Sequence, residues 1–393
     1  MKIITRTVWI LSMISLFTDI ASEMLYPIMP LYLKSIGFSV LLIGILEGVA
    51  EATAGLSKGY FGRLSDRTGR RMPFVQWGYG LSALSKPLLA FLVTPLWVFF
   101  ARTIDRLGKG LRTGARDAVL SEEASPATKG RVFGFHRSMD TLGAVIGPVL
   151  ALIYLQWHPQ HYKALFVLAL APGVLAVGCS FLLKDRSESV KAPSGKTPFF
   201  SFLHYWRSSP AAYKRLVTGL LIFALFNSSD VFLLLKAKQA GLNDSQVIGV
   251  YIFYNLVYAA FAYPMGILAD KIGLKFVFLS GLLLFTIVYI GMAFSPPAYL
   301  FYVLFFLYGM YAAATEGVAK AWISNITPHK DTATAIGTYA GFQSICSLLA
   351  SSIAGVIWFQ FGASMTFLLS AIVTFMVCIY FLVVKQYNFG ARQ

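Results

Sequence analysis

Long apolar runs fill most of this chain, and each is about as long as a membrane-crossing helix. A helix needs about 20 mostly apolar residues to cross a bilayer, and twelve stretches of the sequence meet this requirement. Transmembrane β-barrels instead alternate apolar and polar residues in segments of roughly ten. The pattern therefore predicts an all-α membrane protein with twelve transmembrane helices at residues 8–33, 39–62, 72–93, 96–117, 130–156, 163–183, 214–236, 245–268, 275–294, 299–325, 333–358 and 363–385.

One long polar stretch divides the predicted helices into two groups of six. Residues 184–213 mix Ser, Pro and Gly with charged residues, a composition typical of flexible linkers. We therefore predict an N-terminal six-helix bundle over residues 1–183, a cytoplasmic linker over 184–213 and a C-terminal six-helix bundle over 214–393.

The composition excludes several other classes of protein. Hydrophobic residues make up 57% of the chain and charged residues 13%, whereas soluble domains carry about 25% charged residues. Three cysteines in apolar runs are too few for a secreted disulfide scaffold. The aromatic content of 15% excludes intrinsic disorder.

The distribution of positive charge predicts the orientation in the membrane. If the N-terminus is inside, the inner segments and adjoining helix ends hold 23 of the 33 Lys and Arg residues, and the outer ones hold 4. Cytoplasmic loops collect Lys and Arg, so both termini are expected in the cytoplasm of a multi-pass cell-membrane protein. The net charge of +16 then reflects topology, and we expect no nucleic-acid partner. The first apolar run is too long for a signal peptide and lacks a small-residue cleavage site.

An internal repeat joins the two halves. The segment GRLSDRTGRR at 62–71 aligns position by position with the segment GILADKIGLK at 266–275, so equivalent residues are always the same number of positions apart. The same offset aligns Arg112 of the fourth predicted helix with Glu316 of the tenth. Two parallel six-helix repeats indicate two bundles around a central cavity.

These motifs resemble the major facilitator superfamily over essentially the whole chain. The loop after the second helix matches the family pattern G-x-x-x-D-R-x-G-R-R. The fourth helix, from Arg102, resembles a further family motif but has Asp105 and Arg106 where the family usually has Gln and Gly. The fifth helix resembles the G-x-x-x-G-P motif of the drug/proton antiporter branch at Gly143, Gly147 and Pro148.

The resemblance implies transport by alternating access, with the loop motif acting as a gate. The expected gating residues are Gly62, Asp66, Arg67, Gly69, Arg70 and Arg71, with Asp270 at the repeat-related position of Asp66. We expect Asp66→Ala to impair cycling with little change in substrate affinity.

Ionisable residues inside the predicted helices suggest proton coupling. A charged side chain at the bilayer centre costs about 2.5–3.5 kcal/mol on insertion scales, so such residues should face the bundle interior. Asp19 and Glu23 share a face of the first helix because they are four residues apart. A buried carboxylate that exchanges an Arg partner for a proton can link two gradients. Asp19 and Glu23 are the coupling candidates, with Arg102 as the switching partner that the family resemblance supports.

Other polar residues of the predicted helices are candidates for binding the substrate. Arg106, Lys109 and Arg112 form a basic face of the fourth helix, and Arg pairs well with carboxylate and phosphate; a purely structural ion network remains the alternative. The remaining candidates are His136, Arg137, Asp140, Asn227, Asp230 and Tyr254.

The sequence favours a proton-coupled antiporter that exports a small amphipathic or partly anionic organic molecule. Within transport, the alternatives are uptake of an anionic metabolite and transport of a divalent metal ion. Outside transport, they are a membrane acyltransferase using His136 and Asp140, or a sensor that binds without translocating. No cofactor is expected and the chain contains no ATP-binding Walker motif. The expected partners are a small-molecule substrate, protons and the lipid bilayer, with the protein as a monomer.

Overall fold

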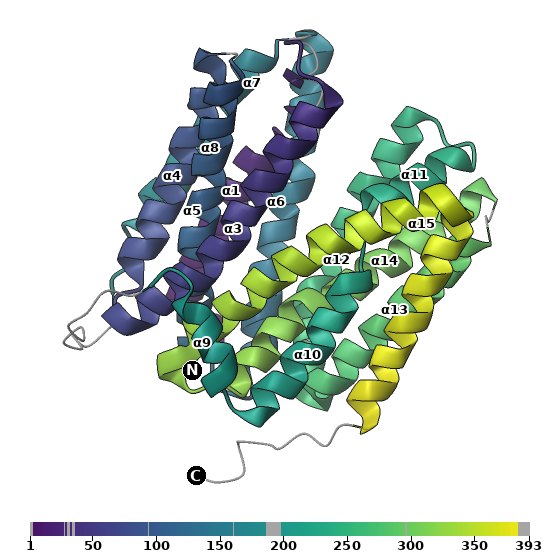
Figure 1. Cartoon of the computed structure of the whole chain (residues 1–393). Helices are drawn as coiled ribbons and strands as arrows, with labels where there is room; N and C mark the ends of the chain where they lie inside the picture. Colours follow the sequence, from purple (N-terminus) through teal and green to yellow (C-terminus); the bar gives the residue numbers. More distant parts are fainter. Residues whose placement is uncertain are drawn as a thin grey trace. The chain divides into compact units, whose positions relative to one another are not determined.

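The computed structural model is helical throughout the part of the chain that it describes. Every regular element there is a helix, as predicted, and Figure 1 shows their order along the sequence. The predicted linker lies partly outside the described residues, and its described end contains α9 (Ser201–Ser208). The described residues are 3–26, 28–29, 32–33, 36–92, 94–159, 161–185, 198–294 and 297–383.

The first compact unit comprises Met1–Glu123, Met139–Ser208 and Pro328–Ser344. Within it, α5 packs against both α3 and α4, and α1 packs against α8. Its helices are α1 (Arg6–Glu23), α3 (Val40–Thr68), α4 (Met72–Phe91), α5 (Pro95–Glu122), α7 (Tyr162–Leu168), α8 (Leu170–Ser180), α9, the later part of α6 (Lys129–Trp157) and the first turns of α15 (Thr332–Val383).

The second compact unit comprises Ala124–Ser138, Ser209–Thr327 and Ile345–Gln393. Its core is strongly aromatic, and the stacked rings of Phe285 and Tyr289 have centroids 3.8 Å apart. Its helices are α10 (Ala211–Phe226), α11 (Val231–Gln239), α12 (Asp244–Ile272), α13 (Leu274–Ala293), α14 (Ala298–Asn325), the start of α6 and the rest of α15.

Each compact unit contains a stretch from the other side of the predicted linker. Residues 124–138 precede the linker but pack within the second unit, and residues 328–344 follow it but pack within the first. The short helix η1 (His329–Asp331) leads into α15 in this exchanged stretch. We keep the division into bundles at 1–183 and 214–393 as a proposal about the repeats.

Several helix ends differ from the predicted ones. The helix predicted over 8–33 is interrupted: α1 ends at Glu23, and helical hydrogen bonds reappear at Met29 and Tyr32, which donate to the carbonyls of Leu25 and Ile28. The helix predicted over 214–236 is broken between α10 and α11. The break falls on Asn-Ser-Ser-Asp at 227–230, whose short polar side chains compete for backbone hydrogen bonds. The two predicted C-terminal helices, 333–358 and 363–385, follow one another within α15, and the non-helical backbone of Gly362 (φ 84°, ψ 168°) separates them at the predicted boundary.

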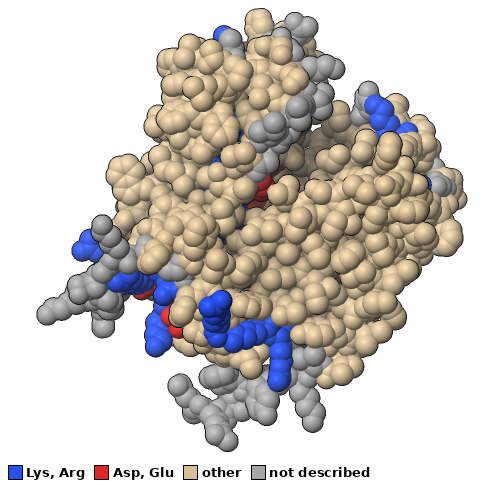
Figure 2. All heavy atoms as spheres, in the orientation of Figure 1, with Lys and Arg blue, Asp and Glu red and all other residues tan. Residues whose placement is uncertain are grey.

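Many helices expose apolar residues to the outside. Seven helical stretches within the described residues are long and apolar enough to cross a membrane, and the crossing of all twelve remains a prediction. On α13, Phe276, Leu283, Ile287 and Ile290 are exposed at helical spacing, which gives one continuous apolar stripe. Most atoms on the face in Figure 2 belong to uncharged residues, and the charged ones gather in a few places. Such surfaces suit lipid contact.

Candidate transport site and gate

Two carboxyl groups contact each other in the first unit, and a third acts on them electrostatically. Asp19 and Glu23 lie on α1, and Asp140 lies on α6, with its carboxyl group in hydrogen-bonding contact with that of Asp19. Close packing of the helices makes this contact possible, because a Cβ atom at Gly143 would lie 2.7 Å from the carbonyl oxygen of Leu16. The glycine motif of the fifth predicted helix therefore positions Asp140 against the coupling candidates.

A buried polar network holds Asp140 on its other side. Ser15 donates a hydrogen bond to Asp140 over 2.5 Å, and Arg116 donates to the Ser15 hydroxyl over 3.4 Å. Arg116 is itself 2.8 Å from Asp117. Sequence reasoning missed Ser15 as part of the site, since a serine in an apolar helix carries no distinguishing pattern. Arg116 was also not among the candidates, although it lies one turn after Arg112 on the same predicted helix.

The structure does not bring Arg102 into an ion pair with Asp19 or Glu23. Arg102 lies 4.0 Å from Asp105, one turn away on α5, and Lys86 of α4 lies 2.6 Å from the same carboxylate. The Asp105 carboxylate therefore lies close to two cationic side chains, those of Arg102 and Lys86. The cationic side chains that act most strongly on the Glu23 carboxylate are those of Lys109 and Arg106.

The three basic candidates of α5 have different surroundings. Arg112 is buried, donates to Ser82 over 2.6 Å and stacks over the Tyr79 ring at 4.5 Å, so it packs against α4. Arg106 lies 3.5 Å from Glu51. Lys109 is exposed and acts electrostatically on Asp19 and Glu23. Of the three, Lys109 is the one that is exposed.

Asp66 ties α3 to the start of α15. Its carboxylate accepts hydrogen bonds from the backbone N–H groups of Ala333 (3.3 Å) and Thr334 (2.6 Å), and from the Thr334 hydroxyl (2.6 Å). Because a helix N-terminus carries unpaired N–H groups and partial positive charge, a carboxylate there is stabilised. The predicted gating aspartate thus caps a helix that begins in the other half of the sequence.

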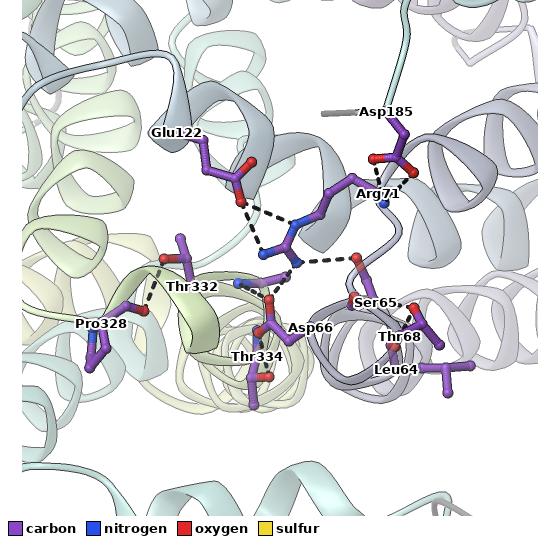
Figure 3. A network of polar contacts seen from close by, with 11 residues as sticks. Leu64, Ser65, Asp66, Thr68, Arg71, Glu122, Asp185, Pro328, Thr332 and Thr334 are labelled. Carbon is purple, nitrogen blue, oxygen red and sulfur yellow. Dashed lines mark hydrogen bonds and ion pairs between the residues drawn. The ribbon is translucent and has the colours of Figure 1, made fainter. Parts of the chain in front are cut away.

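Arg71 completes this network (Figure 3). It forms an ion pair with Asp66, donates to Ser65 over 3.2 Å and lies 3.1 Å from Glu122 of α5. Asp185 accepts from the backbone N–H groups of Arg71 (3.1 Å) and Met72 (3.4 Å), which caps α4. Burial raises the pKa of Asp66, and Arg71 and Thr334 oppose this rise. The pKa of Arg71 is raised by Asp66 and Glu122, which outweigh the lowering by burial.

Three other residues of the loop motif lie at the end of α3 or directly after it. Gly69 ends α3 in the left-handed conformation, with φ 65°, which glycine adopts without strain. Arg70 is exposed, and Arg67 lies in the last turn of α3.

The second unit repeats this arrangement. Asp270 near the end of α12 accepts from the backbone N–H groups of Gly130 (2.7 Å) and Arg131 (3.0 Å) at the start of α6. The Arg131 side chain also lies 3.3 Å from Asp270. Gly266 packs on the Gly130 backbone, just as Gly62 packs on Ala333 in the first unit. The repeat seen in the sequence is therefore also a repeat of contacts.

The remaining candidates line the second unit. Asp230 lies in the break between α10 and α11 and accepts from the hydroxyls of Tyr254 (2.6 Å) and Tyr308 (2.7 Å). Asn227 donates to the Tyr311 hydroxyl over 3.0 Å. Arg137 hydrogen-bonds Tyr258 and lies 3.4 Å from Glu316. His136 is buried on α6.

Comparison with known proteins identifies the family. The sequence model described as the Major Facilitator Superfamily matches residues 11–254 and 231–388. The chain belongs to the major facilitator superfamily. It is a multi-pass membrane transporter and not an enzyme, which removes the acyltransferase alternative. The described residues contain no group of three or more His, Cys, Asp or Glu that would suit a metal ion.

Two relatives match this superfamily protein over nearly all of its length. It is 32% identical over 375 residues to an uncharacterized MFS-type transporter, MJ1317, of Methanocaldococcus jannaschii, covering 94% of this chain and 92% of the relative. It is 22% identical over 379 residues to the multidrug resistance protein MdtG of Dickeya zeae, covering 93% and 90%.

Two solved structures share the fold. The human organic anion transporter MFSD10 superposes with a TM-score of 0.79 at 16% identity, covering 96% of this chain and 99% of that one. The transporter FucP in its outward conformation superposes with a TM-score of 0.73 at 11% identity, covering 98% and 100%. At these identities the likeness supports the all-helical major facilitator fold alone.

Proposed function

We propose that the protein is a proton-coupled antiporter that exports a small amphipathic or partly anionic organic molecule by alternating access. The observation that carries the proposal is the contact between the carboxyl groups of Asp19 and Asp140, with Glu23 one turn away and Lys109 exposed beside them. Two adjacent carboxyl groups can share a proton and release it when their surroundings change. The similarity to a multidrug resistance protein supports export.

The coupling site that we propose contains a different cationic residue from the one predicted from the sequence. Asp19, Glu23 and Asp140 are the proposed proton carriers, and Lys109 takes the place of Arg102 as the charge that competes with the proton. Arg102 then orders α5 through Asp105. An anionic group of the substrate would be attracted by Lys109, because this residue is exposed and its ammonium group carries three hydrogen-bond donors.

The capping contacts of Asp66 and Asp270 are the proposed gate on the cytoplasmic side. Each joins the end of one helix to the start of another from the opposite repeat. In alternating access these contacts break when the cavity opens to the cytoplasm and form again when it closes. The proposed orientation, with both termini in the cytoplasm, follows from the positive charge of the segments around them.

Flux measurements in sealed proteoliposomes test this proposal. A panel of amphipathic and anionic compounds is screened with an imposed pH difference, and export should be driven when protons flow in the opposite direction. Asp19→Asn should abolish the dependence on the pH difference, while Asp19→Glu, which retains a carboxyl group, should keep it.

Two results would contradict the proposal. Full proton dependence in Asp19→Asn removes Asp19 from the coupling role. Flux driven by protons moving in the same direction as the substrate assigns the protein to uptake of an anionic metabolite, which was the first alternative.

A further inference from the structure

The break between α10 and α11 places a carboxylate with unusual partners inside the second unit. Asp230 accepts one tyrosine hydroxyl on each oxygen, from Tyr254 at 2.6 Å and from Tyr308 at 2.7 Å. Helices that are interrupted within a transporter often mark binding sites, because the freed polar groups can contact a ligand. We propose that this carboxylate binds the protonated amine group of the transported molecule, an inference that rests on the transport function proposed above.

The charge around Asp230 is incomplete without a bound cation. Among the described residues, Asp230 forms no ion pair with a Lys or Arg, and the charged group that acts on it is another carboxylate, Glu316. The nearby Arg137 is engaged by Glu316 at 3.4 Å and by Tyr258. Asp230 is half-buried, and charged groups withdrawn from water are normally paired with an opposite charge, so the site suits a ligand that brings a positive charge.

The helix break also contains side-chain oxygens that can accept hydrogen bonds from an ammonium group. Within the described structure, the side-chain oxygen of Asn227 is buried without a hydrogen-bond donor. The Ser228 hydroxyl is also buried, with 4% exposure. A primary ammonium group has three donors, and Asp230, Asn227 and Ser228 together provide three acceptors along one short stretch of chain.

Aromatic rings surround these acceptors and suit the organic part of an amine. The Tyr254 and Tyr308 rings are 5.3 Å apart, the Tyr308 and Tyr311 rings 5.2 Å, and the Tyr251 and Tyr254 rings 5.6 Å. Aromatic rings attract organic cations and bury apolar surface at once. The site therefore favours an amphipathic amine over a small hydrated ion, and it adds a positive group to the partly anionic substrate proposed above.

Equilibrium binding to the purified full-length protein in detergent near neutral pH tests the assignment. The probes are phenethylamine, which is protonated, and phenethyl alcohol, which has a similar shape but no charge. We expect the amine to bind at least about tenfold more tightly, a difference of about 1.4 kcal/mol. Asp230→Asn should remove this preference and leave alcohol binding unchanged, which also shows that the variant is folded.

Two tyrosine variants on one helix make the test independent of Asp230→Asn. Tyr308→Phe removes a hydroxyl that holds the carboxylate and should weaken amine binding severalfold. Tyr302→Phe, at an exposed position of the same helix α14, should leave amine binding unchanged.

Equal binding of amine and alcohol by the wild-type protein would overturn the inference. The same conclusion follows if Asp230→Asn retains the preference, or if sodium ions alone give an Asp230-dependent stabilisation that the amine does not. These binding results are separate from the flux experiment. Amine binding without proton-driven flux contradicts the antiporter proposal, whereas proton-driven flux without amine preference contradicts only this assignment.

Discussion

Asp66 and Asp270 occupy equivalent positions in the two sequence repeats, and each accepts hydrogen bonds from two backbone N–H groups at the start of a helix from the opposite repeat. Asp66 contacts α15, and Asp270 contacts α6. A carboxylate at a helix N-terminus satisfies orphan donors and interacts favourably with the helix dipole. The same local physics therefore secures both halves of the proposed gate.

Removing these caps should destabilise the protein unequally. Asp66→Ala and Asp270→Ala each lose a cap, which typically costs about 0.5–2 kcal/mol. Asp66→Ala should cost more, because it also leaves Arg71 with one carboxylate fewer and the Arg71 side chain is only 8% exposed, against 26% for Arg131. Thermal unfolding in detergent measures both, and flux assays should show slower turnover with substrate affinity changed by less than about twofold.

Asp331 provides the matched control for these variants. It lies in η1, directly before α15, but no side-chain hydrogen bond from it is present among the described residues. Asp331→Ala should therefore change stability by about 0.5 kcal/mol or less. A loss as large as that of Asp66→Ala would show that general charge near the helix end, and not the capping hydrogen bonds, stabilises this region.

Loss of the Arg71 side chain should produce a pH-dependent defect. Arg71 opposes the effect of burial on Asp66, so the pKa of Asp66 rises further in Arg71→Ala. A raised carboxyl pKa in the folded state contributes stability that is complete below the ordinary value of about 4 and is lost as the pH rises through the raised value. Arg71→Ala should thus be most destabilised near neutral pH, by about 3–5 kcal/mol, and less so in acid.

The neighbouring Arg70 separates this effect from a general loss of positive charge. Arg70 is exposed, and Arg70→Ala should shift the unfolding midpoint little at any pH. Unfolding curves for both variants between pH 4 and pH 8 make the comparison. A pH-independent defect in Arg71→Ala would mean that Asp66 does not titrate in response to Arg71.

The repeat in the sequence predicted which residues would be related, but not what they would touch. The constant offset between the two motifs marked Asp66 and Asp270 as equivalent. It carried no information on the partners of either residue, because those partners lie in distant parts of the chain, on α15 for Asp66 and on α6 for Asp270. Local spacing places side chains on a helix face, whereas the opposing helix depends on tertiary packing.

The pairing of buried charges could not be predicted for the same reason. The sequence analysis named Arg102 as the switching partner of Asp19 and Glu23. In the structure, Arg102 lies 4.0 Å from the Asp105 carboxylate, and Lys86 lies 2.6 Å from the same carboxylate. Helix rotation and depth decide such pairings, and neither can be read from periodicity alone. The helix break at Asn227 was missed because the surrounding residues are apolar enough to continue the pattern.

The linker helix α9 should stabilise the contact between α3 and α15. Its Phe202 is buried; the ring lies where a Cβ at Gly59 would meet it at 2.6 Å, and a Cβ at Gly341 would lie 3.7 Å away. Thr338 of α15 donates to the Phe202 carbonyl over 3.4 Å. Phe202→Ala should cost about 3–5 kcal/mol and increase hydrogen exchange in residues 332–344.

Leu203 is the control on the same helix. It is 39% exposed, so Leu203→Ala should lose little packing and leave hydrogen exchange at the start of α15 unchanged. If the two variants behave alike, α9 does not restrain α15 through Phe202.

Glycine-to-alanine changes should destabilise the protein where two backbones are in close contact at the proposed gate, and stabilise it where the glycine faces open space. A Cβ at Gly62 would collide with the Ala333 carbonyl oxygen, and one at Gly266 with the Gly130 carbonyl oxygen. Both substitutions should destabilise the closed gate, because backbone atoms have little room to move. At Gly80 and Gly249, which lie in helices with nothing within 4 Å of the added methyl group, alanine should stabilise by up to about 1 kcal/mol through helix propensity. Thermal unfolding of the four variants measures these signs, and a stabilised Gly62→Ala would mean that α3 and α15 are not packed backbone to backbone.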